Sequence, residues 1–123
     1  MSRNTMIMRV VGRKSGRTYT FPVRYQRHED TITCYTDSGW WKNLRGGAPV
    51  TVLVRGRQLH GTAHPVTDKE LVAGNLLSFL RQTPRDCRYY GVLRDTNGGP
   101  DPDSVTRAAN ITTMVTVRLS SKE

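Results

Sequence analysis

The chain has 123 residues, which allows one hydrophobic core and excludes two, because folding at this length buries roughly two thirds of the unfolded chain's surface. The hydrophobic fraction is 36%, but the apolar residues gather in short β-branched runs, as in a folded protein. A net charge of +9 favours an anionic partner, such as a phosphate, a nucleic acid or an acidic membrane face. Most of the basic residues are arginine, so a genome rich in G and C is the alternative explanation of this charge.

No stretch of the sequence approaches the roughly 20 apolar residues that cross a bilayer, and Met1–Arg9 lacks the apolar run of a signal peptide. We therefore expect a single cytoplasmic domain over residues 1–123 with no transmembrane segment. Cys34 and Cys87 have neither the number nor the spacing of a disulfide framework or zinc site, so both are predicted to be free thiols.

The first part of the chain predicts three strands. The apolar run Met6–Val11 ends at Gly12 and is the first, and a tight basic turn follows it. The second is Thr18–Gln26, where Pro22 indicates an edge, a bulge or a ligand-facing position. The third, Thr31–Thr36, is expected to form a hairpin with the second.

The middle of the chain predicts one short helical turn, a hairpin and a helix. The short helical turn is Trp40–Arg45, and Ser38 is its candidate cap. The hairpin joins a strand from Val50 to Arg55 with a strand over Gln58–Val66. A capping box is expected, in which Thr67 caps the next helix and Glu70 reaches back. The predicted apolar stripe of that helix comprises Leu71, Leu76, Leu77 and Leu80.

The last part predicts a long loop over Arg81–Pro102, a short helix capped by Asp103 and ending at Ala109, and a final strand over Thr112–Leu119. The total is six strands, mostly in antiparallel hairpins, with one main helix. Closure into a barrel is the simplest way to remove sheet edges at this size, so the predicted class is a mainly β, six-stranded antiparallel barrel.

The segment Gly12–Arg17 is the first candidate site. Its backbone N–H groups, a serine hydroxyl and three cations could converge on an anion such as a phosphate. It is not a Walker loop, because the spacing from glycine to lysine is wrong and no helix follows. A solvated hairpin turn is the alternative.

Other groups carry weaker signals. Trp40 and Trp41 suit either a core plug or ligand contact. Tyr89 and Tyr90, beside two arginines, could stack nucleic-acid bases, although packing onto the barrel is preferred. The histidines lack the acids or cysteines of a metal site, so no metal is expected, and no signature places a nucleophile beside a base.

The order of these pieces resembles the deazaflavin-dependent nitroreductase family of split β-barrel oxidoreductases. The resemblance rests on Gly-Arg-Lys-Ser-Gly-Arg at 12–17, Phe-Pro-Val-Arg-Tyr at 21–25, Trp-Lys-Asn-Leu at 41–44 and the Val-rich hairpin around Arg55–Arg57. It covers Met6 to about Val66 well and the rest weakly. It implies a split barrel that binds coenzyme F-420, with FMN or another anionic ligand as the alternative.

The resemblance also implies roles for particular residues. The phosphate contacts would be Arg13, Lys14, Ser15, Gly16 and Arg17. Pro22 and Val23 would lie along the deazaflavin ring, and the opposite wall would comprise Trp41, Lys42 and Asn43. Tyr89 and Tyr90 are weak candidates for substrate contact.

The implied activity is hydride transfer from the reduced coenzyme to a small electron-poor acceptor such as a quinone, an enone or a nitro compound. A non-catalytic binding protein on the same barrel is the second reading, and a nucleic-acid binder is the third and is disfavoured. A homodimer is a further expectation, because split barrels often pair through their open faces.

Overall fold

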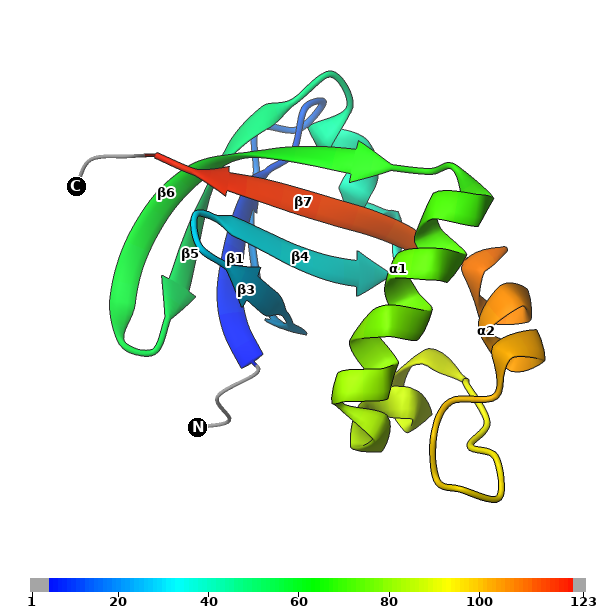
Figure 1. The fold of residues 1–123 in the computed structure, drawn as a ribbon. Coiled ribbons are helices and arrows are strands. Elements are labelled where there is room, and N and C mark those ends of the chain that lie inside the picture. Colours follow the sequence, from blue (N-terminus) through cyan, green and yellow to red (C-terminus); the bar gives the residue numbers. More distant parts are fainter. Residues whose placement is uncertain (1–4, 121–123) are drawn as a thin grey trace. The chain divides into compact units, whose positions relative to one another are not determined.

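A computed structural model describes residues 5–120 of the chain (Figure 1). The strands are β1 (Thr5–Val11), β2 (Thr18–Arg24), β3 (Gln26–His28), β4 (Thr31–Thr36), β5 (Ala48–Val54), β6 (Arg57–Val66) and β7 (Thr113–Leu119). The α-helices are α1 (Lys69–Gln82) and α2 (Pro102–Ala109), and the 3-10 helices are η1 (Gly39–Leu44) and η2 (Pro84–Tyr90). The contacts divide the chain into a sheet unit, up to Pro65 and from Met114, and a helical unit, Val66–Thr113.

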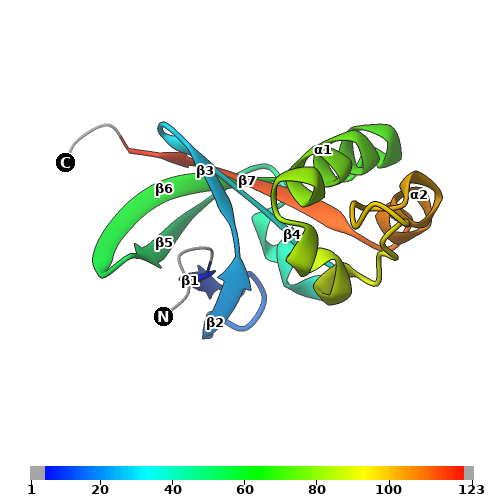
Figure 2. The same cartoon turned by 60° about the horizontal axis from the view of Figure 1, so that its bottom comes forward.

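The strands form one curled sheet in the order β2-β1-β5-β6-β7-β4-β3. β1 pairs antiparallel with β2 and with β5, and β5–β6 and β3–β4 are antiparallel hairpins. Figures 1 and 2 show the strong bend of the β5–β6 hairpin and β7 lying beside β6. The mainly β, antiparallel fold predicted from the sequence is confirmed.

The sheet has seven strands where six were expected among these residues. The stretch predicted as one strand, Thr18–Gln26, is divided at Tyr25 into β2, which pairs with β1, and β3, which pairs with β4. Tyr25 is only 6% exposed, so it fills the core at the point where the chain changes partners. Pro22 lies in β2 at an end of the strand order, and edge strands are where sheets tolerate proline.

The core of the sheet unit follows the alternation of the strands. Val50, Val52 and Val54 of β5 are buried, whereas Leu53 between them is 40% exposed. The other strands add side chains to the same cluster, including Met6, Met8, Val10, Ile32, Cys34, Val115 and Val117.

Helix α1 begins differently from the prediction. Asp68, and not Thr67, is the cap, and its carboxylate accepts from the N–H groups of Glu70 and Leu71. A carboxylate one residue nearer the helix reaches these N–H groups, so the expected capping box does not form. The buried stripe is Val72, Leu76, Phe79 and Leu80, while Leu71 is 55% exposed.

The predicted loop Arg81–Pro102 contains the helix η2, which begins with Pro84 in its first turn. Helix α2 is capped by Asp101, whose carboxylate accepts from Ser104 N at 3.2 Å, so the predicted cap Asp103 lies inside the helix. Pro102 explains the shift, since proline is favoured directly after a cap. Within the helical unit, α1 packs against α2 and η2.

Two properties of residues 5–120 bear on function. None of the helices there is long and apolar enough to span a membrane. No three His, Cys, Asp or Glu side chains in the same range gather closely enough to hold a metal ion. Cys34 and Cys87 are free thiols, and both are buried.

Candidate functional site

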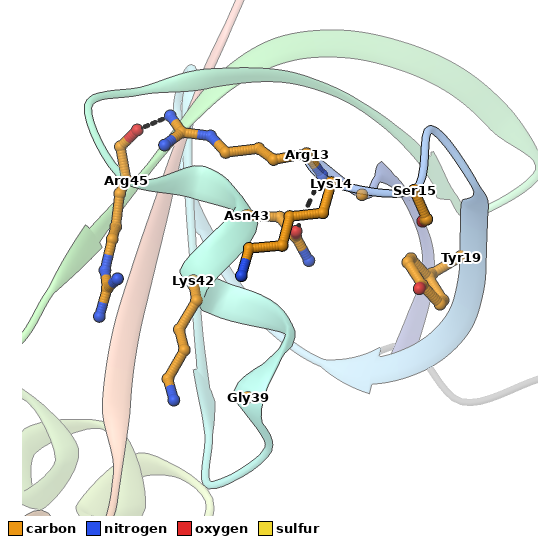
Figure 3. Close-up of a pocket in the computed structure, with 9 residues that line it drawn as sticks. Arg13, Lys14, Ser15, Tyr19, Gly39, Lys42, Asn43 and Arg45 are labelled. Carbon is orange, nitrogen blue, oxygen red and sulfur yellow. Dashed lines mark hydrogen bonds between the residues drawn. The ribbon is translucent and has the colours of Figure 1, made fainter.

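A pocket of about 460 Å³ lies in the sheet unit, where the β1–β2 turn meets η1 (Figure 3). It combines the basic turn with the Trp-Lys-Asn segment, which lies some thirty residues further along the chain. Its lining residues are Gly12, Arg13, Lys14, Ser15, Tyr19, Gly39, Lys42, Asn43 and Arg45.

Backbone hydrogen bonds shape the basic turn. Gly12 N donates to Arg17 O at 2.7 Å, and Gly16 N donates to Gly12 O at 2.9 Å. Gly16 has a φ of +71°, a conformation that favours glycine. Arg17 N donates to Ser15 Oγ at 3.1 Å, so the serine hydroxyl holds the turn and keeps its own proton for an acceptor.

Gly12 brings an aromatic ring close to this turn. A Cβ at position 12 would lie 2.8 Å from Cε2 of Tyr19 and 3.1 Å from Oγ of Ser15. The absence of a side chain therefore lets the half-exposed Tyr19 ring lie against the turn.

Two bonds from Arg13 tie the turn to η1. Its backbone N–H donates to Asn43 Oδ1 at 3.0 Å, and its guanidinium donates to the carbonyl oxygen of Arg45. Asn43 is held in turn, because its Nδ2 donates to Trp40 O at 3.1 Å. The side-chain amide of Asn43 thus bridges two segments of backbone.

The two tryptophans pack beside the segment that carries Lys42, Asn43 and Arg45. Trp40 packs on Phe21 of β2 with ring centroids 4.7 Å apart, and the Arg45 guanidinium lies 5.2 Å from the Trp41 ring centroid. Both tryptophans are half-buried and pack against the core of the sheet unit. Trp41 therefore lies beside Arg45, which lines the pocket, and contact of either tryptophan with a ligand stays a prediction.

The lining is strongly cationic. It carries Arg13, Lys14, Lys42 and Arg45, and no Asp or Glu is among its residues. Figure 3 shows the ammonium groups of Lys14 and Lys42 extending from different elements, with the Ser15 hydroxyl on the same turn as Lys14. Such a set of donors without an acid suits a phosphate or carboxylate ligand.

The pocket includes five of the residues predicted from the sequence, namely Arg13, Lys14, Ser15, Lys42 and Asn43. Gly16 and Arg17 shape the turn but do not line the pocket. Pro22 and Val23 lie further along β2, opposite Ile7 and Met6 of β1, and Trp41 lies under Arg45.

Sequence reasoning missed Tyr19, Gly39 and Arg45 as lining residues. Arg45 ends the predicted helical turn that begins at Trp40, so its charge beside Lys42 was a usable signal. Tyr19 lies in the predicted strand Thr18–Gln26, and no local pattern indicates its closeness to Gly12.

Tyr89 and Tyr90 belong to the helical unit. The Tyr90 ring packs edge-on against Phe79 of α1 with centroids 6.2 Å apart, whereas Tyr89 is 53% exposed. The expectation that these tyrosines contact the substrate stays a prediction.

Several solved structures share the fold of this chain, at 9 to 16% identity. A protein of unknown function from Agrobacterium tumefaciens is 16% identical, with a TM-score of 0.63, over 95% of this chain and 48% of that one. The chain thus spans about half the length of the Agrobacterium protein. An FAD-binding protein from Mesorhizobium loti is 12% identical over 98% and 83% of the two chains, with a TM-score of 0.61.

A structure described as an F420 reductase is 13% identical over 97% of this chain and 88% of that one, with a TM-score of 0.55. With the FAD-binding neighbour, it confirms the split-barrel class predicted from the sequence. No curated protein sequence matches the chain significantly. Residues 1–86 match the F420H(2)-dependent quinone reductase family. This match confirms the resemblance to deazaflavin-dependent reductases and the F-420 cofactor class. The chain belongs to the F420H(2)-dependent quinone reductase family.

Proposed function

We propose that this protein binds coenzyme F-420 at the pocket between the basic turn and η1, and reduces a small electron-poor organic acceptor. The observation that carries the proposal is the gathering of four cations and no acid around one pocket, in a member of a family that depends on reduced F-420. An acidic coenzyme that bears a phosphate is the ligand class such a lining favours.

The residues present fit this ligand. Lys14 and Lys42 offer compact charges from two elements, and Ser15 offers a hydroxyl donor beside them. Arg13 is partly engaged by Arg45 O, so we assign it a positioning role in addition to its charge. Gly16 and Arg17 would shape the phosphate site through the turn backbone.

By the family resemblance, Pro22, Val23 and Trp41 would flank the ring system of the coenzyme, and Tyr89 and Tyr90 would contact the acceptor. When bound, reduced F-420 supplies a hydride, which a quinone, enone or nitro compound can accept. The chain's own residues then need only bind and orient the two partners, so no nucleophile and base pair is required of them.

FMN is the alternative ligand. An FAD-binding protein shares the fold, and a cationic pocket that recognises a phosphate would also accept the phosphate of FMN. In that case, the protein would bind a flavin without deazaflavin-dependent turnover.

The test is a pair of titrations of the purified protein, with F-420 and with FMN, followed by the quench of ligand fluorescence at moderate salt. The proposal predicts saturation by F-420 in the micromolar range, on the order of −8 kcal/mol. Protein-dependent oxidation of reduced F-420 is then measured with a soluble naphthoquinone, a cyclohexenone and a nitroaromatic as acceptors. Saturation by FMN alone selects the alternative, and binding of neither ligand refutes both.

We also propose that the protein is a cytoplasmic homodimer that does not bind nucleic acid. Sedimentation velocity at two protein concentrations tests the dimer. A steep loss of affinity for DNA with rising salt would indicate many phosphate contacts. This result would contradict the proposal that the protein does not bind nucleic acid.

A further inference from the structure

A second cationic pocket lies within the helical unit, at η2 and the segment that follows it. Its volume is about 360 Å³, within the usual range of small-molecule sites. It is built from residues other than those of the first pocket, and the proposed hydride transfer does not use it. Its lining residues are Arg85, Cys87, Arg88, Val92, Leu93 and Arg94.

Two of the three guanidinium groups are held in place by neighbouring residues. Arg94 Nε donates to Gly98 O at 2.7 Å, which leaves both of its terminal nitrogens available. The Arg88 guanidinium lies 5.2 Å from the ring centroid of Tyr89, and its Nη2 is 3.3 Å from the Tyr89 hydroxyl. Preorganised guanidinium groups lose less freedom when they bind an anion.

No Asp or Glu is among the residues that line this pocket, although the buried Asp86 lies close enough to act on Cys87. Between residues 5 and 120, none of the three arginines forms a salt bridge with a carboxylate. Asp95, which follows Arg94, instead accepts from Asn97 N and Gly99 N. Burial raises the pKa of Cys87, which leaves the thiol neutral at pH 7. Three like charges around one pocket repel each other, and an anion would relieve that repulsion.

The pocket is also apolar in part. Val92 is buried, whereas Leu93 is 62% exposed and offers apolar surface to a ligand. An inorganic anion would use only the guanidinium groups and would leave this apolar surface in water. An organic anion with an aryl or alkyl body would cover both features.

We propose that this pocket binds a small organic anion, with its carboxylate or phosphate on the guanidinium groups of Arg85, Arg88 and Arg94 and its apolar body against Val92 and Leu93. This second site shares no lining residue with the coenzyme pocket. It would take a compact aryl or alkyl carboxylate or monophosphate.

The experiment follows backbone amide resonances of the full chain by two-dimensional NMR during four titrations. Phenyl phosphate and benzoate carry both features, and the tighter of the two identifies the preferred anionic group. Inorganic phosphate lacks the apolar body, and benzyl alcohol lacks the charge. We expect saturable shifts of residues 87–94 with an aromatic anion, at least about tenfold tighter than with either partial probe.

Variants locate the site. The double change Arg85→Gln with Arg94→Gln should weaken the aromatic anion about tenfold, and the matched change Arg81→Gln with Arg107→Gln should alter its affinity less than about twofold. If the first variant does not fold, Leu93→Ser serves instead, and it should weaken phenyl phosphate but not inorganic phosphate. Shifts confined to residues 12–15 and 42–45, no saturation, or equal losses in both double variants would overturn the proposal.

Discussion

The backbone N–H of Arg13 donates a 3.0 Å hydrogen bond to Oδ1 of Asn43, which joins the β1–β2 turn to η1. The side-chain amide of Asn43 also donates to Trp40 O through Nδ2, so one side chain satisfies backbone groups in two segments. Through this bridge, the geometry of the basic turn depends on a residue that lies outside the turn.

Replacing Asn43 with alanine should therefore affect both stability and the pocket. The loss of the bridge should lower the free energy of unfolding by about 1 kcal/mol, because the hydrogen bond that joins the turn to η1 is lost. Affinity for F-420 should fall about tenfold as the turn shifts relative to Lys42. Urea unfolding and fluorescence titration measure the two effects.

The matched control is Asn75→Ala. Asn75 lies on the exposed face of α1, and its Nδ2 donates to Leu71 O within the same helix. This change should leave F-420 affinity unchanged and stability almost unchanged, since alanine favours a helix. A loss of affinity in Asn75→Ala as large as that in Asn43→Ala would contradict the bridging role.

The charges of the coenzyme pocket make a second prediction. The double variant Lys14→Gln with Lys42→Gln should weaken F-420 by about 10- to 100-fold and reduce the salt dependence of binding. The melting temperature should hardly change, because exposed charges add little stability.

The control removes the same charge elsewhere in the sheet unit, as Arg27→Gln with Arg57→Gln. Both residues are exposed, and neither lines the pocket. Affinity should change less than about threefold, because the lost charges act only through the general field. Equal losses in the two double variants would mean that net charge, and not this pocket, selects the ligand.

Local patterns predicted most of the sheet. Apolar runs predicted most of the strands, and the break at Gly12 predicted the position of the basic turn. The division of β2 from β3 at Tyr25 escaped prediction, because β propensity continues through the point where the chain changes its pairing partner. The single-domain organisation of residues 1–123 stays a prediction.

The candidate site was predictable in its charges but not in its connections. Lys14 and Lys42 stand in recognisable motifs, whereas the Arg13–Asn43 bond joins residues thirty positions apart and leaves no local signal. The prediction of Thr67 as the cap of α1 failed for a similar reason. Thr67 and Asp68 are both good caps by type, and only the backbone geometry selects Asp68.

Gly74 offers a stabilising substitution in the helical unit. It lies in the interior of α1 on an exposed face, and a Cβ there would have no neighbour within 4 Å. Gly74→Ala should raise the free energy of unfolding by about 0.5 to 1 kcal/mol, because alanine restricts the unfolded chain and favours the helix. Urea unfolding measures the gain, and F-420 affinity serves as the check that the pocket is unaffected. A lower stability would show that the helix cannot accept the methyl group.

The buried thiol of Cys34 predicts a loss of stability at alkaline pH. Burial raises its pKa from the ordinary 9.0 to about 12, and burial also raises the pKa of the neighbouring Tyr35. Between these two values for Cys34, the unfolded state has lost the thiol proton while the native state keeps it. The unfolded state then binds fewer protons, so the free energy of unfolding falls as pH rises, by up to about 1.4 kcal/mol per pH unit for one group.

Urea unfolding at pH 8 and at pH 10 tests this linkage, with Cys34→Ala as the comparison. The variant should be less stable at both pH values, because it leaves a small cavity in the sheet core. Its drop in stability between the two pH values should nevertheless be smaller than that of the unmodified protein, by about 1 kcal/mol. Drops of the same size in both proteins would mean that lysine and tyrosine titration accounts for the alkaline effect and that Cys34 does not contribute.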